Sequence, residues 1–85
     1  MLAIEQRIRQ FVINNFLFGE EDPRFSNDAS FLEEGIIDST GILELVTFVE
    51  CEFGIRLKDT ELVPANLDSV DNLVRFIDGK IKASA

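Results

Sequence analysis

The sequence has no histidine and only one cysteine, Cys51. Histidine is the side chain most used for general acid–base catalysis, and every Ser-His-Asp or Cys-His catalytic arrangement requires it. A single cysteine permits neither an internal disulfide nor a cysteine-cluster zinc site. We therefore expect a protein that is not an enzyme and binds no metal, and we assign Cys51 no function.

Positive charge is also scarce, because 16 acidic residues outnumber 8 basic ones and leave a net charge of −8. Such a surface repels phosphates, which argues against nucleic acid as a partner and favours a basic protein surface. The excess of acidic residues is local: residues 20–71 contain fourteen acidic and three basic residues, a net charge of −11. The two ends of the chain are slightly basic.

Long hydrophobic runs are absent as well. No apolar stretch approaches the roughly 20 residues that span a bilayer. The start of the chain lacks the basic segment and unbroken apolar run of a signal peptide. We expect a cytoplasmic protein that does not contact membranes.

What the sequence does contain is helical periodicity within a length of 85 residues, which suits one domain spanning residues 1–85. Apolar residues recur at helical spacing over residues 2–17, 38–53 and 69–81. Glycines that can adopt a left-handed conformation, Gly19 and Gly54, follow the first two of these segments. The pattern predicts three main helices.

Two further segments complete the expected fold. Asp59 can cap a short helical turn over residues 60–63, which Pro64 would close. Residues 19–38 show no period and are rich in turn formers, so we expect a long loop pinned to the core by its apolar residues. The prediction is an all-α fold, a small four-helix bundle with a long first loop.

Residues 35–46 read Gly-Ile-Ile-Asp-Ser-Thr-Gly-Ile-Leu-Glu-Leu-Val, and this segment resembles the modification segment of acyl and peptidyl carrier proteins. The likeness continues over residues 50–55 and 66–77, in the same order and spacing. An isolated Asp-Ser pair is only a good helix cap. Combined with the chain length, the long first loop and the acidic second helix, it favours a carrier protein.

The resemblance implies that Ser39 is the attachment point of 4′-phosphopantetheine, with Asp38 as the flanking acid that presents the serine. A phosphopantetheinyl transferase would supply the group from coenzyme A with Mg²⁺. The thiol of the arm would then carry acyl or aminoacyl groups as thioesters. Further partners would be a loading ligase and downstream synthase or transferase enzymes, and the carrier itself would be a monomer.

The resemblance also implies a docking surface for basic partner enzymes on and near the second helix. Complementary charge suits fast and reversible encounters. For any single glutamate, a plain solvated helix face is the better explanation, so docking is assigned to the acidic stretch as a whole. The expected docking residues are Thr40, Leu43, Glu44, Thr47, Glu50, Glu52, Asp59 and Glu61.

Three positions depart from the usual family pattern. Thr40 replaces a large aliphatic residue after the serine, Gly41 replaces a common acid, and Thr47 replaces a large apolar residue. These departures favour a stand-alone carrier of a specialised pathway, including pathways that use amino acids, over central fatty-acid synthesis.

Three other functions compete with the carrier. An enzyme that uses the adjacent acids Glu33-Glu34 or Glu20-Glu21 is disfavoured, because an 85-residue bundle offers little room for a pocket. A calcium sensor is excluded because no window supplies the EF-hand ligand pattern. The remaining alternative is an acidic helical module that binds a protein partner and is never modified. Such a module would have no need for Ser39 in this setting.

Overall fold

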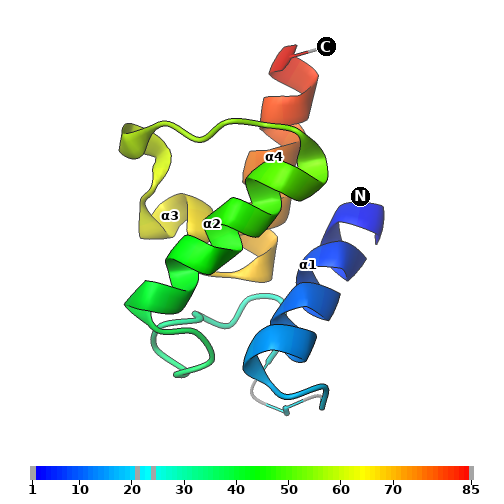
Figure 1. The fold of residues 1–85 in the computed structure, drawn as a ribbon, viewed down its shortest axis with the longest axis vertical. Coiled ribbons are helices and arrows are strands. Elements are labelled where there is room, and N and C mark those ends of the chain that lie inside the picture. The colour runs from blue at the N-terminus through cyan, green and yellow to red at the C-terminus, as the bar shows by residue number, and fades with distance from the viewer. Residues whose placement is uncertain (1, 21, 24, 85) are drawn as a thin grey trace.

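The computed structural model describes residues 2–20, 22–23 and 25–84, and these residues form helices without any strand. The expected all-α fold is confirmed (Figure 1). The elements in chain order are α1 (Leu2–Phe16), α2 (Ser39–Phe53), the 3-10 helix η1 (Asp59–Glu61), α3 (Pro64–Leu67) and α4 (Val70–Ser84).

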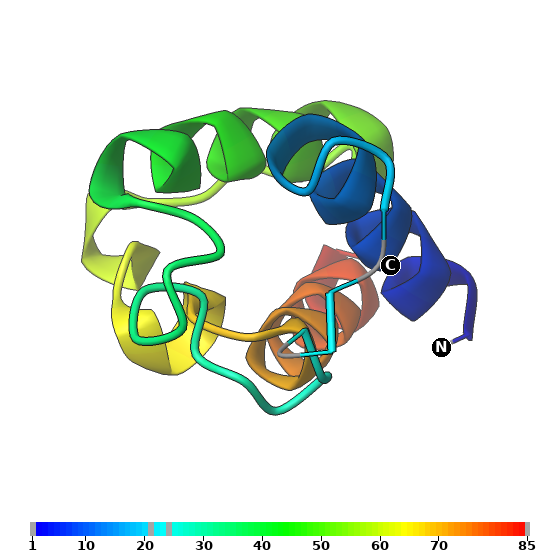
Figure 2. The ribbon, with the colours of Figure 1, turned by 90° about the horizontal axis from the view of Figure 1, so that it is seen from below.

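The helices surround one apolar core, and the long loop crosses one end of the bundle (Figure 2). Every element except η1 contributes buried apolar side chains to that core. The largest fully buried ones are Ile8, Val12, Phe31, Ile37, Leu45, Val49, Val70, Leu73 and Ile77. These residues are the apolar positions of the helical periods, together with two anchors from the loop.

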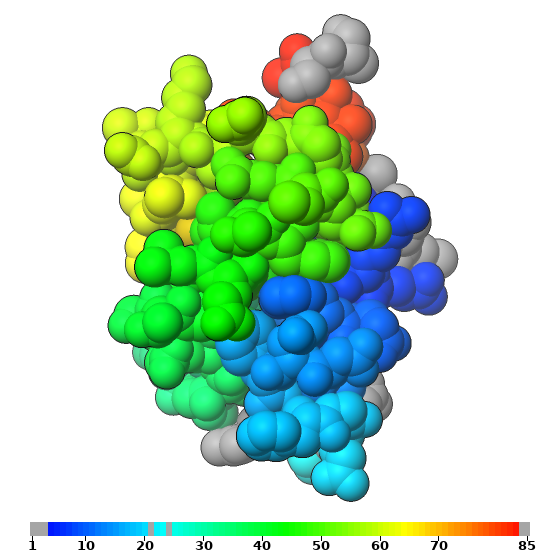
Figure 3. Space-filling model, in the orientation of Figure 1, coloured from blue at the N-terminus to red at the C-terminus, as the bar shows by residue number. Residues whose placement is uncertain are grey.

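Phenylalanines join α1 to α2, which lie side by side along one face of the molecule (Figure 3). The rings of Phe11 and Phe48 stack with centroids 4.1 Å apart and planes 15° apart. Phe16 meets Phe11 edge-on at 5.9 Å, and Phe53 meets Phe48 edge-on at 6.3 Å. Offset stacks and edge contacts of this kind add to the burial energy of the rings.

The ends of α1 and α2 agree with the predicted signals. Asp38 has an extended backbone and caps α2, because its Oδ1 accepts the N–H of Gly41 at 2.7 Å. Gly54 ends α2 with a φ of 64°, and Gly19 follows α1 with a φ of 84°. Phe18 also has a positive φ, of 56°, which the sequence did not predict.

The short helical turn was wrongly placed over residues 60–63, with Pro64 at its end. Pro64 instead begins α3, and the 3-10 turn at Asp59–Glu61 has Lys58, not Asp59, at its N-cap position. Proline suits the first position of a helix, because its missing N–H would have no intrahelical partner there. Val63 before it is extended, as residues before proline are, with a φ of −124° and a ψ of 153°.

The long loop is pinned to the bundle by Phe31, which is fully buried. Its N–H donates to the backbone oxygen of Asp68 at 2.9 Å, and its carbonyl accepts the N–H groups of Ile36 and Ile37. The Asp68 carboxylate accepts hydrogen bonds from the Ser30 hydroxyl and the Leu32 N–H. The loop therefore reaches α2 along a fixed path.

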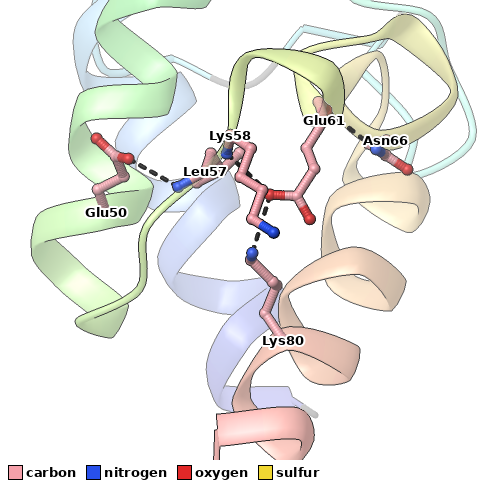
Figure 4. A network of polar contacts seen from close by, with 6 residues as sticks. All are labelled: Glu50, Leu57, Lys58, Glu61, Asn66 and Lys80. Atoms are coloured by element: carbon pink, nitrogen blue, oxygen red, sulfur yellow. Dashed lines mark hydrogen bonds and ion pairs between the residues drawn. The ribbon is translucent and has the colours of Figure 1, made fainter.

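A polar network ties the segment between α2 and α4 in place (Figure 4). Glu61 Oε1 accepts the N–H of Lys58 at 2.8 Å and pairs with Lys80 Nζ of α4 at 2.9 Å. Glu50 Oε2 of α2 accepts the N–H of Leu57 at 2.9 Å. The hydrogen bond from Lys58, followed by that from Lys80, lowers the pKa of Glu61 below its usual value of 4.5.

We expect the contribution of Glu61 to stability to depend on pH. Its folded pKa lies below its unfolded pKa, so the contribution is complete above the unfolded value and is lost as pH falls through the folded value. Urea unfolding of the wild type and Glu61→Gln should therefore differ most at neutral pH, and the gap should close at acidic pH. Lys80→Gln should reproduce part of the neutral-pH loss. A gap that stays constant with pH would contradict this role.

Replacing each of two helical glycines by alanine should change the stability of the fold in opposite directions. A Cβ on Gly41 would lie 2.8 Å from both Ile37 Cγ2 and Phe16 Cε1, whereas a Cβ on Gly79 of α4 would meet nothing within 4 Å. Gly79→Ala should stabilise the fold by about 0.5–1 kcal/mol, because alanine is the better helix former. Gly41→Ala should destabilise it by about 1–2 kcal/mol, because overpacking outweighs that gain. Denaturant unfolding of both variants tests the pair, and stabilisation by Gly41→Ala would refute the close packing.

Candidate functional site

Ser39 is exposed and is the first residue of α2, at the end of the bundle where the long loop arrives. Asp38 before it is also exposed and holds the first turn of the helix through Gly41. A helix N-terminus carries partial positive charge and unpaired amides, so it favours a phosphate group attached there. The environment of Ser39 therefore fits a phosphodiester.

An apolar pocket of about 170 Å³ adjoins Ser39. The loop supplies Leu32, α2 supplies Ile42, and the segment from η1 to α3 supplies the remaining apolar wall. That wall consists of Leu62, Val63, Pro64 and Leu67, and Asp68 lines the pocket beside them. An arm attached to Ser39 therefore starts next to an apolar surface.

A second Asp-Ser pair, Asp68-Ser69, precedes α4, but the structure gives it a different environment. Ser69 is only 5% exposed, and its Oγ accepts the N–H of Asn72 at 3.1 Å, as a helix cap does. Asp68 is occupied by its contacts with the long loop. Of the two pairs, only Asp38-Ser39 presents an exposed serine.

Four of the expected docking residues form one exposed stripe along α2. Thr40, Leu43, Glu44 and Thr47 are all exposed, and their spacing places them on the same side of the helix. Leu43 is 61% exposed, which is high for a leucine at a helix position. We call these four residues the α2 stripe. It begins one residue after Ser39.

The other expected docking residues are not part of this stripe. Glu52 pairs with Arg7 of α1 at 3.0 Å, and Glu50 and Glu61 hold the segment that leads to α3 and α4. The lowered pKa of Glu61 follows from that structural role. Asp59 is exposed on η1. The acids that sequence reasoning grouped together thus lie in different environments.

Three residues that matter for the site were not assigned to it from the sequence. Asp68 fixes the loop beside Ser39, and Lys80 holds Glu61 from 19 residues away. Leu32 forms one wall of the pocket. The repeated Asp-Ser pair was the one available signal for Asp68. No local sequence signal predicts that Lys80 pairs with Glu61, because the two residues lie in distant segments of the chain.

The part of the chain that the structure describes contains neither a candidate metal site nor a helix that could cross a membrane. No group of three or more histidine, cysteine, aspartate or glutamate side chains there is placed to hold a metal ion. Cys51 is exposed on α2 as a free thiol. None of the helices formed by the described residues combines the length and apolar character that a bilayer crossing requires.

Known proteins resemble this chain over almost its whole length. The family described as "Phosphopantetheine attachment site" matches residues 17–77. An acyl carrier protein of Buchnera aphidicola subsp. Acyrthosiphon pisum (strain 5A) is 32% identical over 80 residues, which cover 94% of this chain and 95% of that protein. "Probable acyl carrier protein PigG" of Serratia sp. (strain ATCC 39006) is 31% identical over 80 residues, covering 94% of this chain and 90% of that protein.

Members of this family are carrier proteins that interact with a phosphopantetheinyl transferase and with synthase or transferase enzymes. The family match covers the loop before α2, α2 itself, η1, α3 and the first half of α4, and it includes every residue that lines the pocket beside Ser39. The prosthetic group of such proteins is a covalently attached 4′-phosphopantetheine. The chain belongs to the phosphopantetheine attachment family, which includes the acyl carrier proteins.

Proposed function

We propose that Ser39 is the residue that carries 4′-phosphopantetheine and that the chain shuttles acyl or aminoacyl groups between partner enzymes. The observation that supports this most directly is the exposure of Ser39 at the first position of α2, while the serine of the other Asp-Ser pair is buried. Transfer from coenzyme A forms a phosphodiester at Ser39 Oγ, releases the nucleotide half of coenzyme A and passes the hydroxyl proton to the transferase.

When bound, the group supplies a thiol at the end of a flexible arm, to which cargo is attached as a thioester. The chain's own residues hold the base of the arm. Asp38 stabilises the first turn of α2, and the pocket beside Ser39 offers about 170 Å³ of apolar space. A tethered cargo has a high effective concentration at each docked enzyme, and this is the contribution of a carrier.

The α2 stripe is the proposed docking surface for partner enzymes. It contains one charged side chain, Glu44, and one strongly exposed apolar side chain, Leu43. The acids at positions 50, 52 and 61 already have partners within the chain, so their part in docking is secondary to that of Glu44. Recognition through this stripe combines one carboxylate with a small apolar contact.

The composition of the stripe also supports a specialised pathway. Threonines stand at positions 40 and 47, where the family pattern has larger apolar residues. Gly41, which replaces a common acid, is buried against Phe16 and Ile37, so a longer side chain has no room there. A partner that requires those larger groups would bind this carrier weakly. We assign the chain to a partner set distinct from that of central fatty-acid synthesis.

The modification itself is the first test. Purified chain incubated with coenzyme A, Mg²⁺ and a broad-specificity phosphopantetheinyl transferase should gain one phosphopantetheine unit by intact mass, and Ser39→Ala should gain none. Ser69→Ala is the matched control, because it changes the other Asp-Ser pair. It should be modified normally while losing about 1 kcal/mol of stability as a lost helix cap. An unmodified wild type, beside a control carrier that is modified, would favour the unmodified interaction module.

The stripe is tested by reversing its charge. Glu44→Lys should lower kcat/KM of the same transfer by about threefold to tenfold at low salt, because complementary charge mainly speeds encounter. The difference should shrink at about 0.5 M salt, where screening is strong. Asp71→Lys makes the same charge change at an exposed position of α4 and should have little effect. Equal effects of the two variants on kcat/KM would show that the transferase responds to the net charge of the carrier and not to the α2 stripe.

A further inference from the structure

Phe18 combines two features that a folded protein normally avoids. Its φ of 56° lies in the left-handed region, which is disfavoured for every residue except glycine and, to a lesser degree, asparagine and aspartate. Its side chain is 93% exposed, so the ring gains almost nothing from burial. Residues strained in this way cluster at functional sites.

The backbone on both sides of Phe18 is fixed. The N–H of Gly19 donates to the carbonyl of Ile13 at 2.8 Å, and the N–H of Glu20 donates to the carbonyl of Leu17 at 3.1 Å. Gly19 has a φ of 84° and continues the left-handed turn. The turn that ends α1 therefore holds the Phe18 ring outward in solvent.

Phe18 lies beside the segment that leads to Ser39, because it lines the same hollow as Gly35 and Ile36, which precede Ser39 by four and three residues. Two residues before Phe18, the Phe16 ring packs so closely on Gly41 that a Cβ there would be 2.8 Å from Phe16 Cε1. Gly41 is in the first turn of α2, which begins at Ser39. The Phe16 ring thus joins the last residue of α1 to the first turn of α2.

The surface around Phe18 is hollowed and acidic. Phe18 lines an open hollow of about 400 Å³ together with Pro23, Gly35 and Ile36, and Glu20 and Asp22 lie on its wall. An exposed aromatic ring beside carboxylates is complementary to an apolar pocket with a basic rim. Aromatic side chains that fill such pockets are the usual hot spots of protein interfaces.

We propose that Phe18 is an aromatic anchor for the phosphopantetheinyl transferase, inserting into an apolar pocket of that enzyme whose rim is basic. This rests on the proposed modification of Ser39. A transferase reacts at Ser39 Oγ itself, so it must cover the surrounding surface, and a standard interface covers about 800 Å² of each partner. Enzymes that act on the distal thiol of the arm do not have to reach Ser39 Oγ, so the transferase is the partner for which close contact around Ser39 is required.

The test separates a role of Phe18 in binding from a role in folding, because Phe18→Gly should weaken binding to the transferase and stabilise the fold. Phe18→Gly removes the ring and relieves the left-handed strain, so its melting temperature should rise above that of the wild type. KM for modification by a broad-specificity phosphopantetheinyl transferase should rise about thirtyfold with kcat nearly unchanged, as for the loss of one interface hot spot. Phe18→Ala should raise KM similarly without the gain in stability.

Ile81→Ala is the matched control, since Ile81 is a 38% exposed apolar residue near the far end of α4, and its KM should equal that of the wild type. A wild-type KM for Phe18→Gly would overturn the anchor. A lower melting temperature for Phe18→Gly would also overturn it, because it would show that Phe18 serves the fold. Failure of the proposed modification is recognised separately, by a wild type that gains no mass or a Ser39→Ala variant that does.

Discussion

One buried residue of the long loop, Phe31, determines where Ser39 lies. Its backbone N–H is bonded to Asp68 at the start of the α4 region, and its carbonyl holds Ile36 and Ile37, directly before Asp38. Its ring is fully buried in the core. Because these contacts share one residue, Phe31 links the segment that leads into α2 to the residue pair that precedes α4. The loop is long in sequence, yet it delivers Ser39 to a fixed place.

The same constraint explains why two similar Asp-Ser pairs have different roles. Both pairs cap helices, as such pairs do in general. Asp68 is held against the loop by Ser30 and Leu32, and Ser69 is only 5% exposed. Ser39, in contrast, is exposed. Burial, rather than the dipeptide itself, separates the serine suited to modification from the one that serves the fold.

The sequence was sufficient for the parts of the fold that local patterns control. Helical periods and the glycines at positions 19 and 54 placed α1 and α2 within a residue or two. Pro64 was misplaced because a proline can follow one helix or begin the next, and only the packing of α3 against α4 decides between them. The roles of Glu50 and Glu61 depended on Leu57 and Lys80, whose positions follow from the tertiary structure.

The distribution of those acids changes what the strong negative charge means for recognition. Several carboxylates of the acidic residues 20–71 already have partners within the chain. Glu50 accepts a backbone N–H and Glu52 pairs with Arg7. The carboxylate at position 61 pairs with Lys80, and the one at position 68 binds the long loop. Surface charge of this kind steers encounters over long range but contributes little to close contact. Apolar groups, in contrast, are exposed around Ser39: Leu32, Leu43 and Val63 are all more than a third exposed. Under the proposed function, net charge would bring basic partners to this carrier, while the apolar groups around Ser39 would determine which of them remain bound.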